Sequence, residues 1–390
     1  MNRYYSYLNS AKEIINGYKG EEPLSVYLRK FFAANKKYGS KDRKQISHLC
    51  YCYFRLGKME KGVETEYRVI LGLFLCSDSS NEILQLVRPE WNEVVGLPLL
   101  DKLTLVDQKL KITSVFPWHD QLSGEIDHEE FCKSFFIQPD LFLRIRPGYE
   151  NTTKKKLSDA GINYSLIKND CLIIPNTSKV DSVIDLDKEA VVQDLNSQRV
   201  GELMEKAITN LPTSVNMWDC CAASGGKSIL CYDLKPGIKL TVSDIRESIL
   251  SNLKKRFAKA GINDFKSFAV DLLLPDNIKQ KQFYDFIIAD LPCSGSGTWS
   301  RTPEQLFYFN EKEIDRYADW QKRITGNVVD SLKPGGFLLY ITCSVFKKEN
   351  EQVVELINQQ KKLEIKEMRL FSGYQQKADT LFGALLYKPL

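Results

Sequence analysis

The chain has 390 residues, of which 43% are hydrophobic and 27% charged, and its formal net charge is +4. This length predicts two or three domains, and the mild positive charge permits an anionic partner without requiring one. The ten scattered cysteines do not form a disulfide framework, no apolar run reaches the roughly 18 residues of a membrane span, and no signal-peptide core opens the chain, so we expect a cytoplasmic protein.

Residues 1–120 are predicted to form a helical domain, because apolar side chains recur at helical spacing in 24–32 and 46–54. The segment 29–61 is strongly basic and carries aromatic residues between its charges. Such a run is either a solvated helix face or a surface for RNA phosphates, and the run alone does not decide. Its basic residues are Arg29, Lys30, Lys36, Lys37, Lys41, Arg43, Lys44, Arg55, Lys58 and Lys61.

A cysteine pair in the same region, Cys50 and Cys52, has the C-x-C spacing of some zinc ligands. No second Cys or His pair at zinc spacing follows it, so we expect no metal site.

Residues 121–200 are predicted to form a small α+β domain. Helix-like and strand-like stretches alternate here over short distances. The predicted helices are 127–136 and 151–160, and the predicted strands are 141–146, 164–167 and 171–174.

Residues 201–390 alternate strands and helices with the period of a mostly parallel sheet covered by helices on both faces. We therefore predict an α/β, Rossmann-like domain, with two edge strands at 363–371 and 383–387. The other predicted strands are 215–219, 239–243, 266–270, 284–289 and 336–342, and the helices are 227–234, 246–260, 311–332 and 349–361.

The first strand of this region leads into Asp219, a small-residue loop at 221–226 and then a helix that begins near Lys227. A strand, a glycine turn and a helix form the nucleotide-binding corner of an open α/β sheet. Gly226-Lys227-Ser228 also matches the end of a P-loop, but Cys221 stands where that motif needs its first glycine.

Two aspartates at predicted strand ends favour a nucleoside ligand. Asp244 stands about 20 residues past the glycine turn, where a carboxylate suits a ribose diol, and Asp271 follows the next strand, where it could meet an adenine edge. The alternative is that each aspartate only caps the helix that follows its strand.

Two cysteines follow successive strands of the predicted sheet. Asp290-Leu291-Pro292-Cys293 ends one strand and Thr342-Cys343-Ser344 ends the next, so both thiols should lie at one edge. A thiolate that adds to carbon 6 of a pyrimidine turns carbon 5 into a nucleophile for a methyl group. An acid near ring nitrogen 3 assists this addition, a role that suits Asp290. The alternative for any one cysteine is inert packing.

These motifs together resemble the RNA cytosine-5 methyltransferase family, in its Sun (RsmB) and NOL/NSUN group. The resemblance covers about 190–390. Stretches 193–198 and 379–384 resemble further family motifs, and stretches 41–43 and 49–55 resemble its NusB-like RNA-binding domain. The motifs that carry it are the loop 221–227, Asp244, Asp271, the run 290–295 and the run 342–344.

The resemblance implies S-adenosylmethionine as the methyl donor, Cys343 as the nucleophile and Cys293 as the thiol that helps to release the product. The chain departs from the family at Ser224, usually proline, and at Leu291, usually alanine; neither change removes a functional group. The residues implied for the cofactor site are Cys221, Ala222, Ala223, Ser224, Gly225, Gly226, Lys227, Asp244, Asp271 and Asp290.

The sequence therefore predicts an enzyme that methylates carbon 5 of a cytosine in RNA through a covalent cysteine–cytosine intermediate. Small-subunit ribosomal RNA is the favoured substrate, and transfer RNA is the alternative. A catalytically silent RNA-binding assembly factor is the rival from another class. We expect a monomer that needs no metal and no membrane.

Overall fold

The computed structural model describes residues 3–168, 170–278 and 282–390. The chain divides into two compact units, which we call the helical unit and the sheet unit. The sheet unit includes most of the segment 121–200, and whether this segment is a domain of its own stays a prediction. No helix among the described residues is long and apolar enough to cross a membrane. The helical unit comprises Met1–Leu122, Ile126–Gln138 and Thr298–Asn310, and the sheet unit comprises Ser123–Glu125, Pro139–Gly297 and Glu311–Leu390.

The helical unit is built mainly from the first third of the chain, and it also takes in one helix from far along the sequence. This helix, α14, packs on α3, where the Phe307 ring lies 5.5 Å from that of Tyr53 and 5.4 Å from that of Phe54. The helices of the unit are α1 (Arg3–Gly17), α2 (Leu24–Ala34), α3 (Ser40–Arg55), α4 (Thr65–Cys76), α5 (Glu82–Val87), α6 (Pro89–Glu93), α7 (Leu99–Val106), α8 (His128–Ser134) and α14 (Pro303–Tyr308).

Three cations of the basic segment 29–61 serve the internal structure of the helical unit. The buried Arg55 guanidinium donates to the Phe135 carbonyl at 2.6 Å, and the Lys58 ammonium donates to the Phe309 carbonyl at 2.7 Å. Lys61 donates to the Phe307 carbonyl at 3.1 Å. An interpretation of the whole segment as an RNA surface is therefore wrong for these three side chains. The exposed remainder consists of Arg29, Lys30, Lys36, Lys37, Lys41, Arg43 and Lys44.

The sheet unit contains a small antiparallel sheet with the order β2-β3-β1-β4. Leu143 and Leu172 of this sheet form a buried core with Leu157 of the helix α9. The helix and the strands predicted for 141–174 are present. The elements are β1 (Leu141–Ile145), α9 (Glu150–Asp159), β2 (Ser165–Lys168), β3 (Cys171–Ile174) and β4 (Ala190–Val192).

The large sheet has the order β10-β11-β9-β8-β5-β6-β7, and the five strands from β9 to β7 are parallel. The predicted α/β, Rossmann-like fold class is confirmed. The prediction of two edge strands at the end of the chain is wrong for β11, which lies between β9 and β10 and runs antiparallel to both. The strands are β5 (Asn216–Asp219), β6 (Lys239–Asp244), β7 (Phe265–Ala269), β8 (Tyr284–Asp290), β9 (Leu332–Thr342), β10 (Glu364–Phe371) and β11 (Leu381–Tyr387).

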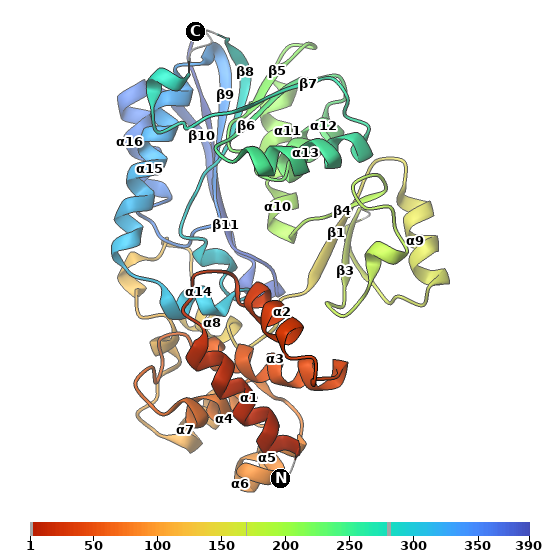
Figure 1. Cartoon of the computed structure of the whole chain (residues 1–390). Helices are drawn as coiled ribbons and strands as arrows, with labels where there is room; N and C mark the ends of the chain where they lie inside the picture. Colours follow the sequence, from red (N-terminus) through yellow and green to blue (C-terminus); the bar gives the residue numbers. More distant parts are fainter. Residues whose placement is uncertain (1–2, 169, 279–281) are drawn as a thin grey trace. The chain divides into compact units, whose positions relative to one another are not determined.

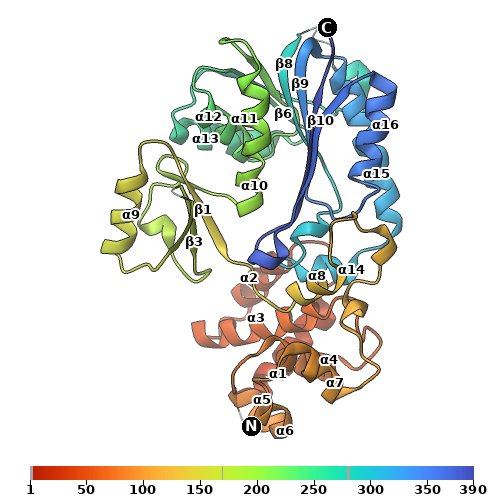
Figure 2. The same cartoon turned by 180° about the vertical axis from the view of Figure 1, so that it is seen from behind.

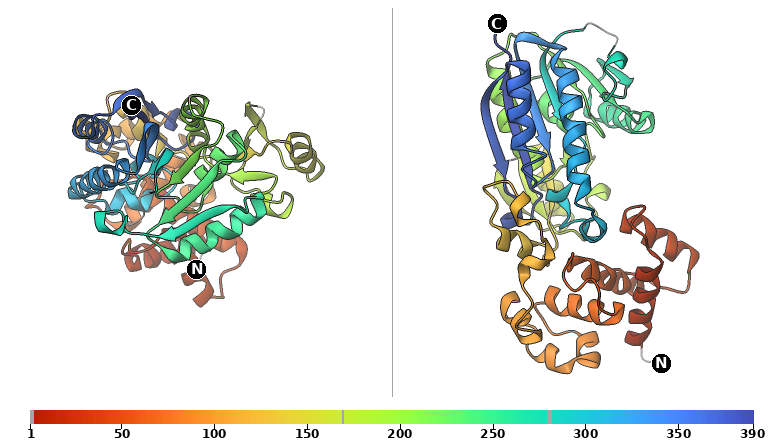
Figure 3. Two further views of the ribbon diagram at one scale, coloured as in Figure 1. Left: turned by 90° about the horizontal axis from the view of Figure 1, so that it is seen from above. Right: turned by 90° about the vertical axis from the view of Figure 1, so that its left-hand side faces the viewer.

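Helices cover both faces of the large sheet, as Figures 1, 2 and 3 show. The helices α11, α12 and α13 share one buried core with the strands, to which Leu203, Ile229 and Leu253 belong. The helices α15 and α16 cover the opposite face (Figure 2). The bounds are α10 (Leu195–Arg199), α11 (Gly201–Thr209), α12 (Gly226–Leu234), α13 (Glu247–Ala260), α15 (Lys312–Val329) and α16 (Glu351–Lys361).

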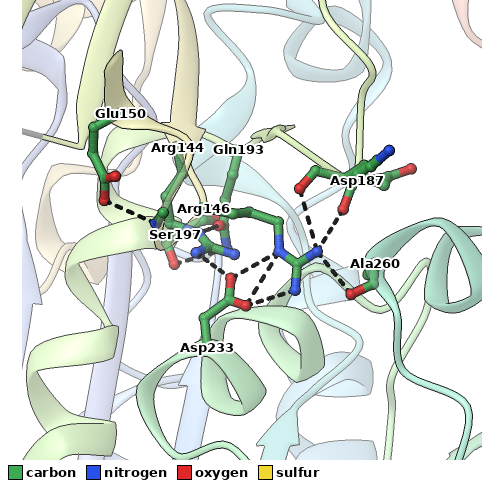
Figure 4. A network of polar contacts seen from close by, with 10 residues as sticks. Arg144, Arg146, Glu150, Asp187, Gln193, Ser197, Asp233 and Ala260 are labelled. Carbon is green, nitrogen blue, oxygen red and sulfur yellow. Dashed lines mark hydrogen bonds and ion pairs between the residues drawn. The ribbon is translucent and has the colours of Figure 1, made fainter. Parts of the chain in front are cut away.

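A buried ion-pair network fastens the small sheet to the helices of the large sheet (Figure 4). Asp233 of α12 accepts hydrogen bonds from Arg144 Nη1 at 2.7 Å and from Arg146 Nη2 at 2.8 Å. Arg146 also donates to the Ala260 carbonyl at the end of α13, at 2.8 Å. Because a buried charge is costly unless it is paired, this network fixes how the small sheet is docked within the sheet unit.

Candidate active site

A cavity of about 620 Å³ opens at the carboxyl ends of β5, β6, β8 and β9. In an open α/β sheet, ligands bind at this edge. A larger hollow of about 900 Å³ lies between α11 and β9, β10 and β11, but no thiol is among its described lining residues. The first cavity is lined by Cys220, Cys221, Ala223, Asp244, Ile245, Arg246, Val270, Asp271, Leu272, Leu273, Asp290, Leu291, Pro292, Cys293, Trp320, Ile324 and Cys343.

The loop between β5 and α12 forms one wall of this cavity. It turns through two residues of positive φ, Ala223 at 44° and Gly225 at 83°. A Cβ atom on Gly225 would lie only 2.7 Å from a ring carbon of Phe257, so this turn requires glycine. The turn directs the start of α12 toward the strand ends.

Asp244 is the last residue of β6 and faces the same loop. Its carboxylate accepts the Ala223 amide at 3.1 Å, and it accepts both the amide and the guanidinium of Arg246, at 2.9 and 3.1 Å. Asp271 lies just past the end of β7 and accepts the Leu273 amide at 3.0 Å. Each carboxylate thus accepts the amide two residues further on, and neither caps a helix, so the capping alternative is wrong; both aspartates line the cavity.

Lys227 and Asp290 form an ion pair at the base of the site. Lys227 Nζ lies 2.7 Å from Asp290 Oδ2, and Lys227 is 9% exposed. Burial alone would lower the pKa of Lys227, but the negative charges of Asp290 and of the Cys343 thiol, when ionised, raise it. Behind this pair, burial raises the pKa of Asp219 to about 7. The Lys227 ammonium is thus held charged beside both Asp290 and Cys343.

The structure places the two thiols side by side. Cys343 follows the last residue of β9, and its amide donates to Cys293 Sγ at 3.3 Å. The adjacent strands β8 and β9 are parallel and pair Asp290 with Ile341, which brings the two loops together. A hydrogen bond with the Cys343 thiol, burial and the negative charges of Cys343 and Glu349 raise the pKa of Cys293 well above its usual value.

Five of the residues predicted for the cofactor site line the cavity: Cys221, Ala223, Asp244, Asp271 and Asp290. The other five belong to the same loop and helix start but are not among the described lining residues. Their roles stay predictions, and those residues are Ala222, Ser224, Gly225, Gly226 and Lys227.

Ser224 makes a different contact, with Arg256 of α13. Its hydroxyl and its carbonyl both accept Arg256 Nη1, at 2.9 and 2.8 Å, and Arg256 pairs in turn with Asp187 at 2.6 Å. The residue that departs from the family pattern is thus held by a side chain of α13 that is itself bound to the small-sheet region.

Several functional candidates were missed by sequence reasoning. Arg246 covers the Asp244 carboxylate, and Trp320 and Ile324 of α15 form an apolar part of the cavity wall. The two α15 residues gave no separable signal, because their spacing is that of an ordinary amphipathic helix. Glu349 was missed as well, because it stood at the start of a predicted helix. No cluster of His, Cys, Asp or Glu side chains able to hold a metal occurs within residues 3–168, 170–278 and 282–390.

The family model and the relatives that match this chain are ribosomal RNA methyltransferases. Residues 207–385 match the family model "16S rRNA methyltransferase RsmB/F". The Ribosomal RNA small subunit methyltransferase B of Shewanella oneidensis is 32% identical over 173 residues, 43% of this chain and 38% of that protein. The Probable ribosomal RNA small subunit methyltransferase B of Coxiella burnetii is 28% identical over 190 residues, 48% of this chain and 43% of that protein. The matches span less than half the length of these relatives.

Two solved structures share the fold. The crystal structure of PH0851 has a TM-score of 0.72 at 19% identity, covering 100% of this chain and 99% of that one. NSun6 from Pyrococcus horikoshii, in a crystal structure with SFG, has a TM-score of 0.59 at 14% identity, covering 70% of this chain and 97% of that one. At these identities the likeness shows the fold alone.

Proposed function

We propose that the chain, whose residues 207–385 match the RsmB/F methyltransferase family model, methylates carbon 5 of a cytosine in RNA with S-adenosylmethionine as donor. Small-subunit ribosomal RNA is the favoured substrate. The observation that carries this proposal is that Cys293 and Cys343 lie together in the wall of one cavity, where the Cys343 amide donates to Cys293 Sγ at 3.3 Å.

The residues of the cavity fit S-adenosylmethionine. Its volume, about 620 Å³, lies in the usual range of small-molecule sites. The Asp244 carboxylate would hold the ribose hydroxyls, Asp271 the adenine edge, and the amides of the loop 221–227 the polar tail, while Leu272 and Ile324 offer apolar walls. When bound, this cofactor supplies an electrophilic methyl group.

Cys343 is the nucleophile in this proposal. The Lys227 ammonium lies beside Cys343, which gives this thiol the electropositive setting in which reactive cysteines are found. The Cys343 sulfur forms a bond to carbon 6 of the cytosine, and the electron pair of the carbon 5–carbon 6 double bond becomes available at carbon 5.

The proton that this addition needs at ring nitrogen 3 comes from the Lys227–Asp290 pair. Lys227 donates a hydrogen bond to Asp290 at 2.7 Å, so the two side chains act as one unit beside the base. We assign the donated proton to the pair and the alignment of the base to Asp290. Cys293 serves the release step: a base takes the carbon 5 proton, that C–H electron pair restores the carbon 5–carbon 6 double bond, and the Cys343 sulfur leaves carbon 6 as a thiolate.

RNA contact is assigned to the exposed cations of the helical unit. Lys36 and Lys37 precede α3, and Lys41 and Lys44 lie in its first turns. Cations at a helix start are unfavourable beside the helix dipole, and a bound phosphate would offset that cost. This assignment extends the predicted NusB-like role of the region to particular side chains.

The two thiols can be separated by trapping. Cys293→Ala should still attack and methylate the cytosine, and should then accumulate a methylated protein–RNA complex that survives denaturing electrophoresis. Cys343→Ala should form no complex and transfer no radiolabelled methyl group. Cys76→Ala, in the helical unit, is the matched control and should behave as the wild type. RNA from a strain that lacks the protein is the substrate, followed by bisulfite sequencing.

The possible results distinguish the alternatives. A trapped Cys343→Ala with an inert Cys293→Ala would reverse the roles of the thiols. Methyl transfer to transfer RNA alone would replace the favoured substrate. RNA binding without methyl transfer by the wild type would support the silent assembly factor and refute the proposed enzyme.

A further inference from the structure

Glu349 is a carboxylate with 0% exposure in the loop before α16, and its two oxygens hold three different segments. Oε2 accepts the Ser294 amide at 2.9 Å and Gln321 Nε2 of α15 at 2.9 Å. Oε1 accepts the Ser344 hydroxyl at 2.8 Å. Such a buried charge is tolerated only because it is fully hydrogen-bonded.

The partners of Glu349 are the neighbours of the two thiols. Ser294 directly follows Cys293, and Ser344 directly follows Cys343. Gln321 Nε2 donates at the same time to the Pro292 carbonyl, at 3.1 Å, so the backbone is held on both sides of Cys293. One carboxylate therefore ties the Cys293 loop to the end of the strand that carries Cys343.

We propose that Glu349 is a positioning residue for the methyl transfer proposed above: it fixes Cys293 against Cys343 and places a negative charge on the Cys293 side of the pair. The direction of the hydrogen bonds supports an ionised Glu349. Two N–H groups can only donate to Oε2, and the Ser344 hydroxyl oxygen already accepts the Phe346 amide at 3.0 Å, leaving its proton for Oε1. Burial raises the pKa of Glu349, and these donors oppose that rise.

The charge of Glu349 distinguishes the two thiols. Cys343 and Glu349 raise the pKa of Cys293, and Cys293 in turn raises that of Tyr340; none of these three neighbours is a cation. Lys227 faces Cys343 instead. The carboxylate of Glu349 is one of the charges that raise the pKa of Cys293, whereas the Lys227 ammonium lies on the Cys343 side of the pair. These two charges are therefore a physical reason for the order in which the thiols act.

The test uses the full-length protein without RNA. Glu349→Gln keeps an oxygen for the Ser294 and Gln321 donors and an amide that can donate to the Ser344 hydroxyl, but it removes the charge. The rate of iodoacetamide alkylation at each cysteine is followed against pH by peptide mass spectrometry. Cys293 should react roughly threefold to tenfold faster at a given pH, since one pKa unit is a tenfold change in thiolate. Cys343 should change little.

A second variant and a second readout keep the inference open to refutation. Glu349→Ala removes the hydrogen bonds as well, and should lower kcat for methylation with the KM for RNA unchanged. Glu351→Gln, a nearby carboxylate bound to Ser123 and not to either thiol loop, is the control and should match the wild type. Wild-type alkylation profiles and wild-type kcat in Glu349→Gln would overturn the role of Glu349. Absence of methylation by the wild type would instead refute the proposed function, while the alkylation result would still decide whether Glu349 sets the ionisation of Cys293.

Discussion

Removal of the Lys227 ammonium tests most directly what the Lys227–Asp290 ion pair contributes to stability and to the proposed chemistry. Lys227→Met keeps the length of the apolar stem and deletes the charge that lies 2.7 Å from Asp290. Loss of one partner of a buried ion pair costs about 3–5 kcal/mol. The Lys227 side chain is 10% exposed and the Asp290 side chain 26%, so water partly screens the remaining carboxylate and we expect about 3 kcal/mol, near the lower limit.

The assay is a double-mutant cycle with Asp290→Asn. The free energy of unfolding is measured in urea for each full-length variant. Each single variant leaves one uncompensated charge, whereas the double variant leaves none. Its loss of stability should therefore be smaller than the sum of the single losses by about 2 kcal/mol. Lys235→Met, at the far end of α12 and hydrogen-bonded to the Pro212 carbonyl, should change stability by less than about 0.5 kcal/mol.

The same variants should also differ in kcat for methyl transfer. Lys227→Met should lose most of its kcat, because the Cys343 thiolate and the proton at ring nitrogen 3 both depend on the ammonium. The double variant should regain stability without regaining activity. Strictly additive losses of stability would show that the two side chains are not one energetic unit. Wild-type kcat in Lys227→Met would refute the role given to Lys227 in the chemistry.

Three further outcomes are expected. Asp244→Asn should weaken S-adenosylmethionine binding by about tenfold or more in calorimetry, since hydrogen bonds to a charged group contribute about 1.5–3 kcal/mol each; unchanged affinity would remove Asp244 from the site. Because burial raises the pKa of Asp219 from 3.8 to about 7, the folded chain holds more protons there than the unfolded chain, and stability should fall as pH rises through that window. Asp219→Asn should flatten this dependence, and an equally steep curve would contradict it. Charge reversal of four exposed lysines of the helical unit should lower the salt slope of RNA binding by about 0.7 for each phosphate that the variant no longer binds. A slope equal to that of the wild type and of a control reversed at Lys109 and Lys111 would show that these lysines do not bind the RNA backbone. The four are Lys36, Lys37, Lys41 and Lys44.

Much of the large sheet could be predicted because its signals are local. The run 286–289 is apolar and fully buried as a central parallel strand should be, and the glycine turn before Lys227 has a backbone requirement that only a few residues meet. The strand ends also determined which carboxylates and thiols would share an edge. These features need no knowledge of what packs against them.

Other features depend on partners that are remote in the sequence. Arg55 and Lys58 look like exposed cations in a basic run, and only their carbonyl partners at Phe135 and Phe309 show that they are structural. The helix α14 belongs to the helical unit although it follows β8 along the chain. The position of β11 inside the sheet is likewise a matter of pairing, since its apolar pattern is that of an edge or an interior strand alike.

The order in which the two thiols react also depends on residues that are remote in the sequence. Cys293 and Cys343 each follow a strand and each precede a serine, so their local sequences cannot say which one ionises. We propose that the difference comes from Lys227 on one side and Glu349 on the other, which belong to α12 and to the loop before α16. The family resemblance ranks the thiols by their motifs, whereas the physical reason proposed here lies in charges that only the fold brings to the pair. A variant that exchanges the local sequences around the thiols without moving these two charges should therefore leave Cys293 the slower thiol to react with iodoacetamide.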